Sequence, residues 1–509
     1  MGIRQTGIAL FVSAFVIRLV AAAMLPLIPD EAYYWSWSVR PAVCYWDQPA
    51  GSAFFLGLAD RWFGHSELSL RLFPIIGSLV SALLAVRILR EVMQPDVALL
   101  SVALTLFAPL AFGGTLAVHD SFMVAFWTMA LFAAYRLRTQ PGRFRWWLLL
   151  AWFWALAVYS KLSALLFGFG IVLYIAGAGR FKDWLFNPRA WVAAVVFIAL
   201  LFPVLAWNIG HSGVTLLAVR RLTLIHPARG IADSALNMLD LAGSQALLAT
   251  PGLFLLILLA MVRAPVSLKR ERDEFAWFLF SFCAPVFLFF AWLALKSKVQ
   301  GNWPAPAYAA AFPLAIWYVH RGWHRRAVRS LAKLAIAILA LETALAGLHI
   351  AHPIVGTSKD PTLQMWGWRE LARRVESEAK ACDASFVLVR KYQVASELMF
   401  YLDEPLPVLC ANYSGRGNQF DLWNDFRSVE GLNAVVVDTS KKLQTLLMHF
   451  DSHDELEPQM LARGSIRIRT MRLICAKGFR LAGPHEIYFR DPFGYSLRRL
   501  QTLVRSGAR

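Results

Sequence analysis

The chain has 509 residues, of which 58% are hydrophobic and only 17% are charged. That composition is too apolar for a soluble protein of this length and indicates many membrane spans. A formal net charge of +18 could suit a nucleic-acid-binding protein. The basic residues, however, lie in short loops between apolar segments, where they act as topology signals and meet anionic lipid. We therefore predict a polytopic α-helical membrane protein with membrane lipid, and no nucleic acid, as a partner.

Eleven apolar runs are candidate transmembrane helices, which need about 17 to 25 residues each. In chain order they cover residues 8–28, 68–88, 97–116, 120–137, 146–159, 162–178, 190–207, 246–262, 275–295, 304–320 and 330–350. The first run is too long for a signal peptide and has no small-residue cleavage site, so we predict a retained span. The fifth and sixth runs are separated only by Ser160 and Lys161. If these two runs formed one span, every later loop would be assigned to the opposite side of the membrane.

Lys and Arg residues are distributed unevenly between alternate loops. The set of connections that includes the N-terminus holds twice as many as the other set. Because positive loops stay in the cytoplasm, we place the N-terminus inside a bacterial inner membrane. An odd number of spans then places the tail in the periplasm. The expected domains are a transmembrane domain over residues 1–350, with a first outer loop at 29–67, and a periplasmic domain over 351–509.

The tail is polar and mixed in pattern. Strand-like runs occur at 386–389, 434–438, 466–471 and 486–489, and helix-like stretches at 366–380, 393–402 and 440–450, which predicts a small α/β domain. Gly415-Arg416-Gly417 is more typical of a turn than of a phosphate loop, because no strand-to-helix context or Lys-Ser/Thr follows it. We assign the tail no chemistry. Its three cysteines, Cys382, Cys410 and Cys475, can form at most one disulfide.

The first outer loop carries a carboxylate pair, Asp30 and Glu31, directly after the first span. Charges next to hydrocarbon are costly, so two adjacent acids need either water or a function. An ordinary interfacial loop with an aromatic belt is the competing interpretation. Residues 53–58 with Trp62 predict an interfacial helix. Arg18, inside the first span, needs a partner, and we favour a structural role for it.

Acids, bases and cations gather on the predicted outer face. They are Asp30, Glu31, Asp47, Gln48, His119, Asp120, Tyr159, Lys161, His211, Arg220, Arg221, Lys296, Lys298, Asn302 and Trp303. A carboxylate can accept a proton from a hydroxyl as a general base. Nearby cations can hold a phosphate and stabilise charge that develops on it. The combination fits transfer of a group from a lipid phosphate to an acceptor alcohol.

The order of these pieces resembles a known family. The pieces are Asp30-Glu31-Ala-Tyr-Tyr-Trp, Tyr45-Trp46-Asp47-Gln48-Pro49, Glu67-Leu-Ser-Leu-Arg71-Leu, Leu116-Ala-Val-His119-Asp120, Ser160-Lys161, Trp207-Asn208 with His211, and Asn302-Trp303-Pro304-Ala305-Pro306. Over residues from about 10 to 320 the chain resembles the bacterial relatives of the dolichyl-phosphate-mannose protein mannosyltransferases and of the lipid A aminoarabinose transferases. Among them it is most similar to rhizobial-type galacturonosyltransferases that modify lipid A and lipopolysaccharide core.

The resemblance implies a GT-C glycosyltransferase fold, a polyprenyl-phosphate sugar as donor, inversion at the anomeric carbon and an envelope glycolipid as acceptor. By position, it implies that the catalytic acids are Asp30, with Glu31 beside it, and Asp120. Asp47 and Gln48 occupy the donor-site segment, and Lys161 matches a basic residue near the donor. The remaining candidates for donor or phosphate binding are Tyr159, His211, Arg220, Arg221, Lys296 and Lys298.

One position departs from the family pattern. The family often has Asp-His-Pro-Pro or Glu-Lys-Pro-Pro where this chain has Asp47-Gln48-Pro49-Ala50. The lost cation leaves Lys161 or the later Arg and Lys residues to contact the phosphate. A donor whose sugar is already linked through a phosphate diester requires no metal for the phosphate to leave, so we predict no cofactor and no metal ligands. A divalent ion that bridges Asp30 and the phosphate stays an open alternative.

Three other functions stay open from the sequence. A lipid or sugar-lipid transporter or flippase would show internal repeats and polar groups near mid-bilayer, and neither is evident. A family-related protein O-mannosyltransferase would differ from the glycolipid-modifying transferase in its acceptor, which would be a protein. A sensor built around the tail would need a signalling module, which is not visible.

Overall fold

The computed structural model describes residues 2–223, 228–354, 360–439 and 443–506. The chain divides into two compact units, each described by itself. The first comprises residues 1–24, 48–209 and 222–348. The second comprises residues 25–47, 210–221 and 349–509. The first outer loop up to Asp47 therefore belongs to the same unit as the C-terminal segment.

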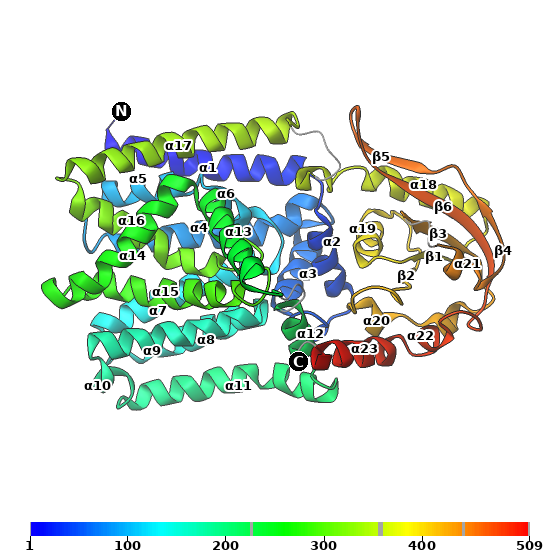
Figure 1. Cartoon of the computed structure of the whole chain (residues 1–509), viewed down its shortest axis with the longest axis horizontal. Coiled ribbons are helices and arrows are strands. Elements are labelled where there is room, and N and C mark those ends of the chain that lie inside the picture. The colour runs from blue at the N-terminus through cyan, green and yellow to red at the C-terminus, as the bar shows by residue number, and fades with distance from the viewer. Residues whose placement is uncertain (1, 224–227, 355–359, 440–442, 507–509) are drawn as a thin grey trace. The chain divides into compact units, whose positions relative to one another are not determined.

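The first unit is a helical bundle whose long helices run alongside one another (Figure 1). Its helices are α1 (Ile3–Met24), α3 (Gly51–Phe63), α4 (Glu67–Leu89), α5 (Pro95–Thr105), α6 (Pro109–Phe112), η1 (Gly113–Thr115), α7 (His119–Thr139), α8 (Phe144–Ser160), η2 (Leu162–Leu166), α9 (Phe167–Ala178), α10 (Phe181–Trp184), α11 (Pro188–Gly210), α13 (Ile231–Ala249), α14 (Pro251–Glu271), α15 (Glu274–Ala294), η3 (Ala305–Ala307), α16 (Tyr308–Gly322) and α17 (Arg326–Ala351).

Six of these helices are long and apolar enough to cross a membrane within the described part of the chain: α1, α4, α11, α14, α15 and α17. The pair α5 and α6–η1 passes the same test but bends by 85°, and residues 162–178 form a shorter apolar helix. The protein is thus a multi-pass membrane protein. Helices also occupy the other expected spans, but the total of eleven stays a prediction.

Two predicted span boundaries are wrong. The first span was expected to reach residue 28, yet α1 ends at Met24. The run at 246–262 crosses a break, because Pro251 starts α14 directly after α13 ends at Ala249. Proline is favoured in the first turn of a helix, where its missing N–H costs nothing. The apolar run therefore belongs to two helices rather than one.

The predicted separation at Ser160 and Lys161 is confirmed. Lys161 is extended, with φ −158° and ψ 130°, between α8 and η2. The Trp154 indole donates a hydrogen bond of 2.9 Å to the Ala164 carbonyl, and its ring lies 5.5 Å from that of Phe167. In one continuous helix, residues 154 and 167 would be about 20 Å apart. The chain therefore reverses here, and Trp154 of α8 contacts the start of α9 at Phe167.

Arg18 is almost fully buried on α1 and hydrogen-bonds the carbonyls of Ala14 (2.8 Å) and Leu106 (2.7 Å). Leu106 follows the last residue of α5, at the sharp bend before α6. The guanidinium also lies 5.4 Å from the ring centres of Phe15 and Phe112. The expected partner of Arg18 is therefore a backbone carbonyl exposed by a broken helix.

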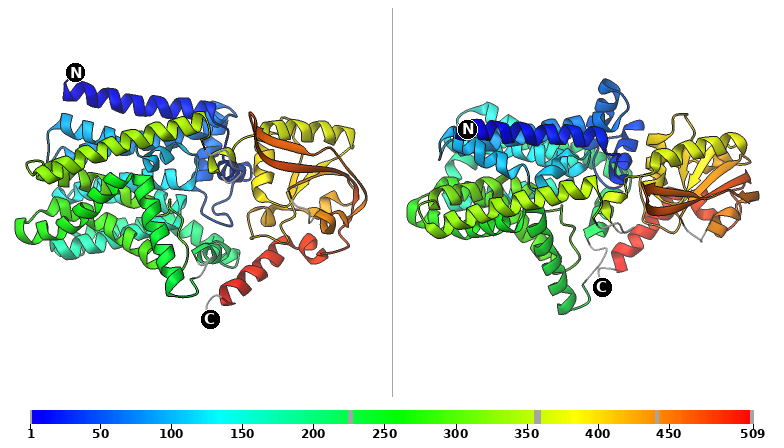
Figure 2. Two further views of the ribbon diagram at one scale, coloured as in Figure 1. Left: turned by 45° about the horizontal axis from the view of Figure 1, so that its top comes forward. Right: turned by 90° about the horizontal axis from the view of Figure 1, so that it is seen from above.

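The second unit holds the sheet and the helices around it (Figure 2). Its helices are α2 (Pro29–Val39), α12 (Val214–Thr223), η4 (Pro361–Leu363), α18 (Trp368–Ala381), α19 (Tyr392–Tyr401), α20 (Phe420–Trp423), η5 (Phe426–Val429), α21 (Gln444–Leu447), α22 (Glu486–Arg490) and α23 (Pro492–Ser506). Its strands are β1 (Phe386–Val389), β2 (Val408–Cys410), β3 (Ala434–Asp438), β4 (Phe450–Glu455), β5 (Gln459–Arg463) and β6 (Ile466–Phe479).

The strands form a mixed sheet in the order β2-β1-β3-β6-β4, with β5 paired to β6. β1 runs parallel to β2 and β3, whereas β6 runs antiparallel to β3, β4 and β5. Every residue of β1 and β3 is buried, as is usual for central strands covered on both faces.

Most predicted tail elements are confirmed. The runs at 386–389 and 434–438 are β1 and β3, 466–471 is the first half of β6, and α18 and α19 occupy the helix-like stretches. The strand expected at 486–489 is wrong, because these residues form α22. The helix expected at 440–450 is reduced to α21; residues 440–442 lie outside the described residues.

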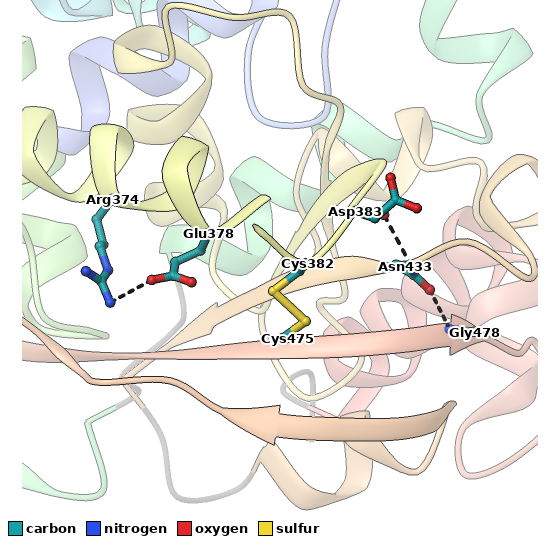
Figure 3. The surroundings of a disulfide bond; sticks show 7 residues. All are labelled: Arg374, Glu378, Cys382, Asp383, Asn433, Cys475 and Gly478. Atoms are coloured by element: carbon teal, nitrogen blue, oxygen red, sulfur yellow. Dashed lines mark hydrogen bonds and ion pairs between the residues drawn. A yellow bond between two sulfur atoms is a disulfide. The ribbon is translucent and has the colours of Figure 1, made fainter. Parts of the chain in front are cut away.

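A disulfide joins Cys382, at the end of α18, to Cys475 on β6 (Figure 3). The two Cα atoms are 5.8 Å apart, within the normal range for a disulfide. Beside it, the Asn433 side chain donates to the Asp383 carbonyl (3.2 Å) and accepts from the Gly478 amide (3.1 Å). The prediction of at most one disulfide in the tail is confirmed, and Cys410 is free and buried.

Candidate functional site

The predicted site residues divide between the two units. The first unit holds Gln48, His119, Asp120, Tyr159, Lys161, Lys296, Lys298, Asn302 and Trp303, and the second holds Asp30, Glu31, Asp47, His211, Arg220 and Arg221. Each group is described within its own unit. Their catalytic and binding roles stay predictions.

Asp120 and Lys161 form the central pair of the first unit. The Lys161 ammonium lies 2.7 Å and 3.0 Å from the two carboxylate oxygens of Asp120. Asn302 donates a further hydrogen bond of 3.0 Å to the same carboxylate. The Lys161 and Asp120 side chains are 15% and 17% exposed, so the pair is shielded but still reachable. Three segments far apart in sequence thus meet at one carboxylate.

Local structure explains this meeting. Asp120 lies in the first turn of α7, where the helix dipole favours a negative charge. Lys161 lies where α8 ends, and the amide of the next residue, Leu162, donates to the Gln48 side chain (3.1 Å). A Cβ on Gly51 would collide with the backbone of Tyr159, so the start of α3 can approach α8 only with glycine there. Gln48 therefore holds the turn that carries Lys161.

The other predicted residues of the first unit have different neighbours in the bundle. The Tyr159 hydroxyl donates to the Leu200 carbonyl on α11 (2.9 Å). His119 contacts the Ser52 hydroxyl through its Nδ1 atom. Lys298 pairs with Asp240 at 3.2 Å in an exposed ion pair, and Lys296 is exposed. Of these residues, His119 lies close enough to Lys161 for the two to interact electrostatically.

The two acids at the start of α2 occupy different environments. Asp30 is exposed, whereas Glu31 is fully buried. The Glu31 carboxylate accepts a hydrogen bond of 3.0 Å from the amide of Ile28, the residue before α2, and so satisfies a backbone donor at the helix start. Glu31 therefore has a clear structural task, and Asp30 is the acid of the pair that a substrate can reach.

Asp47 is buried in the second unit, with 5% of its surface exposed. One carboxylate oxygen accepts a hydrogen bond of 2.9 Å from the Tyr33 hydroxyl. The other oxygen has no hydrogen-bond partner among the described residues, and the nearest cation is Arg416, at 3.5 Å. Arg416 belongs to the segment between β2 and α20, for which the sequence predicts no chemistry.

Tyr392, at the start of α19, lies among these charged groups. Burial raises the pKa of Tyr392 to about 12; the charge of Arg416 lowers it, and the charges of Asp30 and Asp47 raise it. Burial, with the charge of Asp47, also holds the pKa of Tyr33 well above its ordinary value. The two phenols therefore stay protonated near neutral pH; the Tyr33 hydroxyl donates to Asp47, whereas the Tyr392 hydroxyl accepts from Arg416. Asp30, Asp47 and Arg416 all lie near one half-buried tyrosine.

Residues 210–221 pack against the same outer segment. The Thr215 hydroxyl on α12 donates to the Tyr45 carbonyl (2.7 Å), and the His211 ring lies 6.4 Å from that of Phe493. Arg220 and Arg221 follow in the last turn of α12.

Among the described residues, no group of three or more His, Cys, Asp or Glu is placed to hold a metal ion.

The sequence model of the family described as dolichyl-phosphate-mannose-protein mannosyltransferase matches residues 47–207. The chain superposes on the crystal structure of ArnT from Cupriavidus metallidurans bound to undecaprenyl phosphate, with a TM-score of 0.62 and 15% identity, over 94% of this chain and 99% of that one. The apo structure of the same protein gives a TM-score of 0.61 and 17% identity over the same shares.

The chain has the GT-C fold. The resemblance to this superfamily of protein mannosyltransferases and ArnT is confirmed. The lipid A galacturonosyltransferase RgtD of Rhizobium johnstonii is 23% identical over 380 residues, which are 73% of this chain and 77% of that protein.

Proposed function

We propose that this GT-C protein is an inverting glycosyltransferase that moves a sugar from a polyprenyl-phosphate donor to an envelope glycolipid. The observation that carries the proposal is the exposed carboxylate of Asp30 at the start of α2, in a chain with the GT-C fold. A reachable carboxylate next to a buried partner acid is suited to accept a proton. The undecaprenyl phosphate bound by ArnT supports a lipid phosphate as the carrier.

In the proposed reaction, Asp30 accepts the proton of the acceptor hydroxyl while the hydroxyl oxygen attacks the anomeric carbon. The bond between that carbon and the phosphate oxygen breaks, and its electron pair leaves with polyprenyl phosphate. Attack from the face opposite to the phosphate inverts the anomeric carbon. Lys161, paired with the Asp120 carboxylate that also accepts a hydrogen bond from Asn302, is a cation that can stabilise the departing phosphate.

The proposed acceptor is lipid A or lipopolysaccharide core, and the proposed sugar is galacturonic acid. The Rhizobium relative is a lipid A galacturonosyltransferase, which supports lipid A as acceptor and galacturonic acid as sugar. We place the reaction at the periplasmic face of the inner membrane. The Cys382–Cys475 disulfide supports this location for the C-terminal segment, because disulfides persist in oxidising compartments.

Mass spectrometry of envelope glycolipids from a deletion strain tests the proposal. Loss of one hexuronic-acid increment, restored by the wild-type gene, is the expected result. Loss of a hexose or pentosamine increment instead would keep the glycosyltransferase and replace the sugar. An unchanged glycolipid profile under conditions where the protein is produced would count against an envelope glycolipid acceptor.

A further inference from the structure

The segment 412–421, between β2 and α20, is built on one buried carboxylate. Asp421, 2% exposed, accepts hydrogen bonds from the Asn418 amide (3.0 Å), the Asn412 side chain (3.2 Å) and the Tyr488 hydroxyl (3.0 Å). These hydrogen bonds connect both ends of the turn to each other and to α22. Arg416, at its tip, is therefore presented by a well-defined scaffold.

This turn packs directly on the first outer loop, within one unit of the structure. The Trp46 amide donates to the Gln419 side chain (2.8 Å), and the Gln419 amide donates to the Tyr33 hydroxyl (2.9 Å). A Cβ on Gly417 would overlap the Trp46 indole. Glycine at this position is thus required by close packing against the loop that carries the predicted acids.

Arg416 lies across the Tyr392 ring, with its guanidinium carbon 5.5 Å from the ring centre. It donates to the Tyr392 hydroxyl (3.3 Å) and lies 3.5 Å from Asp47, which is attractive but too long for a good hydrogen bond. A guanidinium has five N–H donors, and among the described residues this is its only hydrogen bond. The side chain is 36% exposed. Arg416 is therefore held in place, yet has donors to offer.

We propose that Arg416 is a substrate-binding residue that holds an oxyanion of the glycosyl donor. The oxyanion is either the phosphate of the lipid carrier or the carboxylate of a hexuronosyl unit, because both suit the planar fork of arginine. Asp47 offsets part of the charge and orients the guanidinium, and Asp30 lies near the same tyrosine. The C-terminal segment thereby supplies a cation that the outer loop lacks at Gln48. This inference rests on the proposed function.

Kinetics of Arg416→Gln, Arg416→Lys and the wild-type full-length protein test the proposal. Loss of a charged hydrogen-bond donor should raise the KM for the donor about 10- to 100-fold, with a smaller change in kcat. Arg416→Lys should recover part of the loss, because it keeps the charge but not the fork. Arg40→Gln is the matched control: Arg40 also lies over a ring, that of Trp423, but it bonds a backbone carbonyl.

Binding of free undecaprenyl phosphate separates the two oxyanions. Weaker binding by Arg416→Gln assigns the residue to the phosphate, whereas unchanged binding with a raised KM for a hexuronosyl donor assigns it to the carboxylate. An unchanged KM, or a loss of kcat alone, would overturn the inference and leave Arg416 as a positioning residue for Asp47. Wild-type protein without transfer activity would instead contradict the proposed function.

Discussion

Lys161 and Asp120 form the most closely coupled charged pair of the helical bundle's candidate site. Replacing Lys161 with Met should lower kcat/KM for sugar transfer by about 100-fold, because one stabilising cation is lost from the departing phosphate. Lys161→Arg should retain part of the activity. In the double variant Asp120→Asn/Lys161→Met, kcat/KM should fall by less than the two single losses combined. Each single change already breaks the pair. Additive losses would show that the two side chains act separately.

The buried carboxyl of Asp421 is expected to make the stability of the protein depend on pH. Burial raises the pKa of Asp421 to about 7, against roughly 3.9 in an unfolded chain. Between these values the folded state holds a proton that the unfolded state has released. Stability should therefore fall as pH rises from about 4 to about 7, by at most about 1.4 kcal/mol per pH unit. Burial also raises the pKa values of Cys410 and Tyr488, which keeps both neutral in this window.

The Asp421→Asn variant isolates this contribution, because its side chain does not titrate. Thermal unfolding in detergent between pH 5 and pH 8 should show a flatter profile for the variant than for the wild type. Parallel profiles would mean that Asp421 is ionised in the folded protein throughout this range.

Individual residues were predictable where a sequence neighbour carried the signal. Asp30 stands out because a second acid and a span boundary adjoin it, and Asp120 and Lys161 because each lies at the end of an apolar run. Arg416 and Tyr392 were missed, since their contacts with Asp47 join positions more than 300 residues apart. The two glycines beside Arg416 were the one available signal, and alone they indicate only a turn.

Helix α1 is linked to the bent pair α5 and α6 through Arg18. Replacing Arg18 with Leu leaves the Leu106 carbonyl without its charged donor and should destabilise the protein by about 2 kcal/mol. Arg18→Lys should cost less, because it keeps one donor. Thermal unfolding in detergent measures both variants. Leu100→Ala on α5 serves as a packing control without a polar contact, and an Arg18→Leu variant as stable as the wild type would contradict the assigned role.

Elements were predictable where hydrophobic length or alternation was strong. The break between α13 and α14 was missed because the apolar run continues across Pro251, although proline there signals a helix start. The strand expected at 486–489 was wrong because four residues are too few to separate a strand from a helix by pattern. Strand β4 was missed because five of its six residues are exposed and polar side chains dominate it.

The disulfide bears on the location of the C-terminal segment. It closes a loop with a sequence separation of 93. Replacing Cys382 and Cys475 with Ser should destabilise this segment by about 3 to 5 kcal/mol. Thiol mapping of protein from the bacterial membrane should find these two cysteines protected and Cys410 alkylated only after unfolding. A reduced pair in freshly isolated membranes would argue against a periplasmic C-terminal segment.

The sequence predicted a bundle followed by a separate tail domain with its boundary near residue 350. In the structure, residues 25–47 and 210–221 group with the tail. Local patterns cannot reveal this grouping, because it depends on contacts such as Trp46 with Gln419 and Tyr33 with Asp47. The tail segment thus takes part in shaping the outer loop that carries Asp30.

The central claim is that Asp30 is the base of a polyprenyl-phosphate-dependent sugar transfer. Purified wild-type protein, given a polyprenyl-phosphate hexuronic acid and lipid A, should release free polyprenyl phosphate and form the modified lipid. Asp30→Asn should fold normally but show no product, whereas Asp454→Asn, an exposed acid on β4, should match the wild type. Near-normal transfer by Asp30→Asn, or no transfer by wild-type protein with donor and acceptor present, would contradict the account.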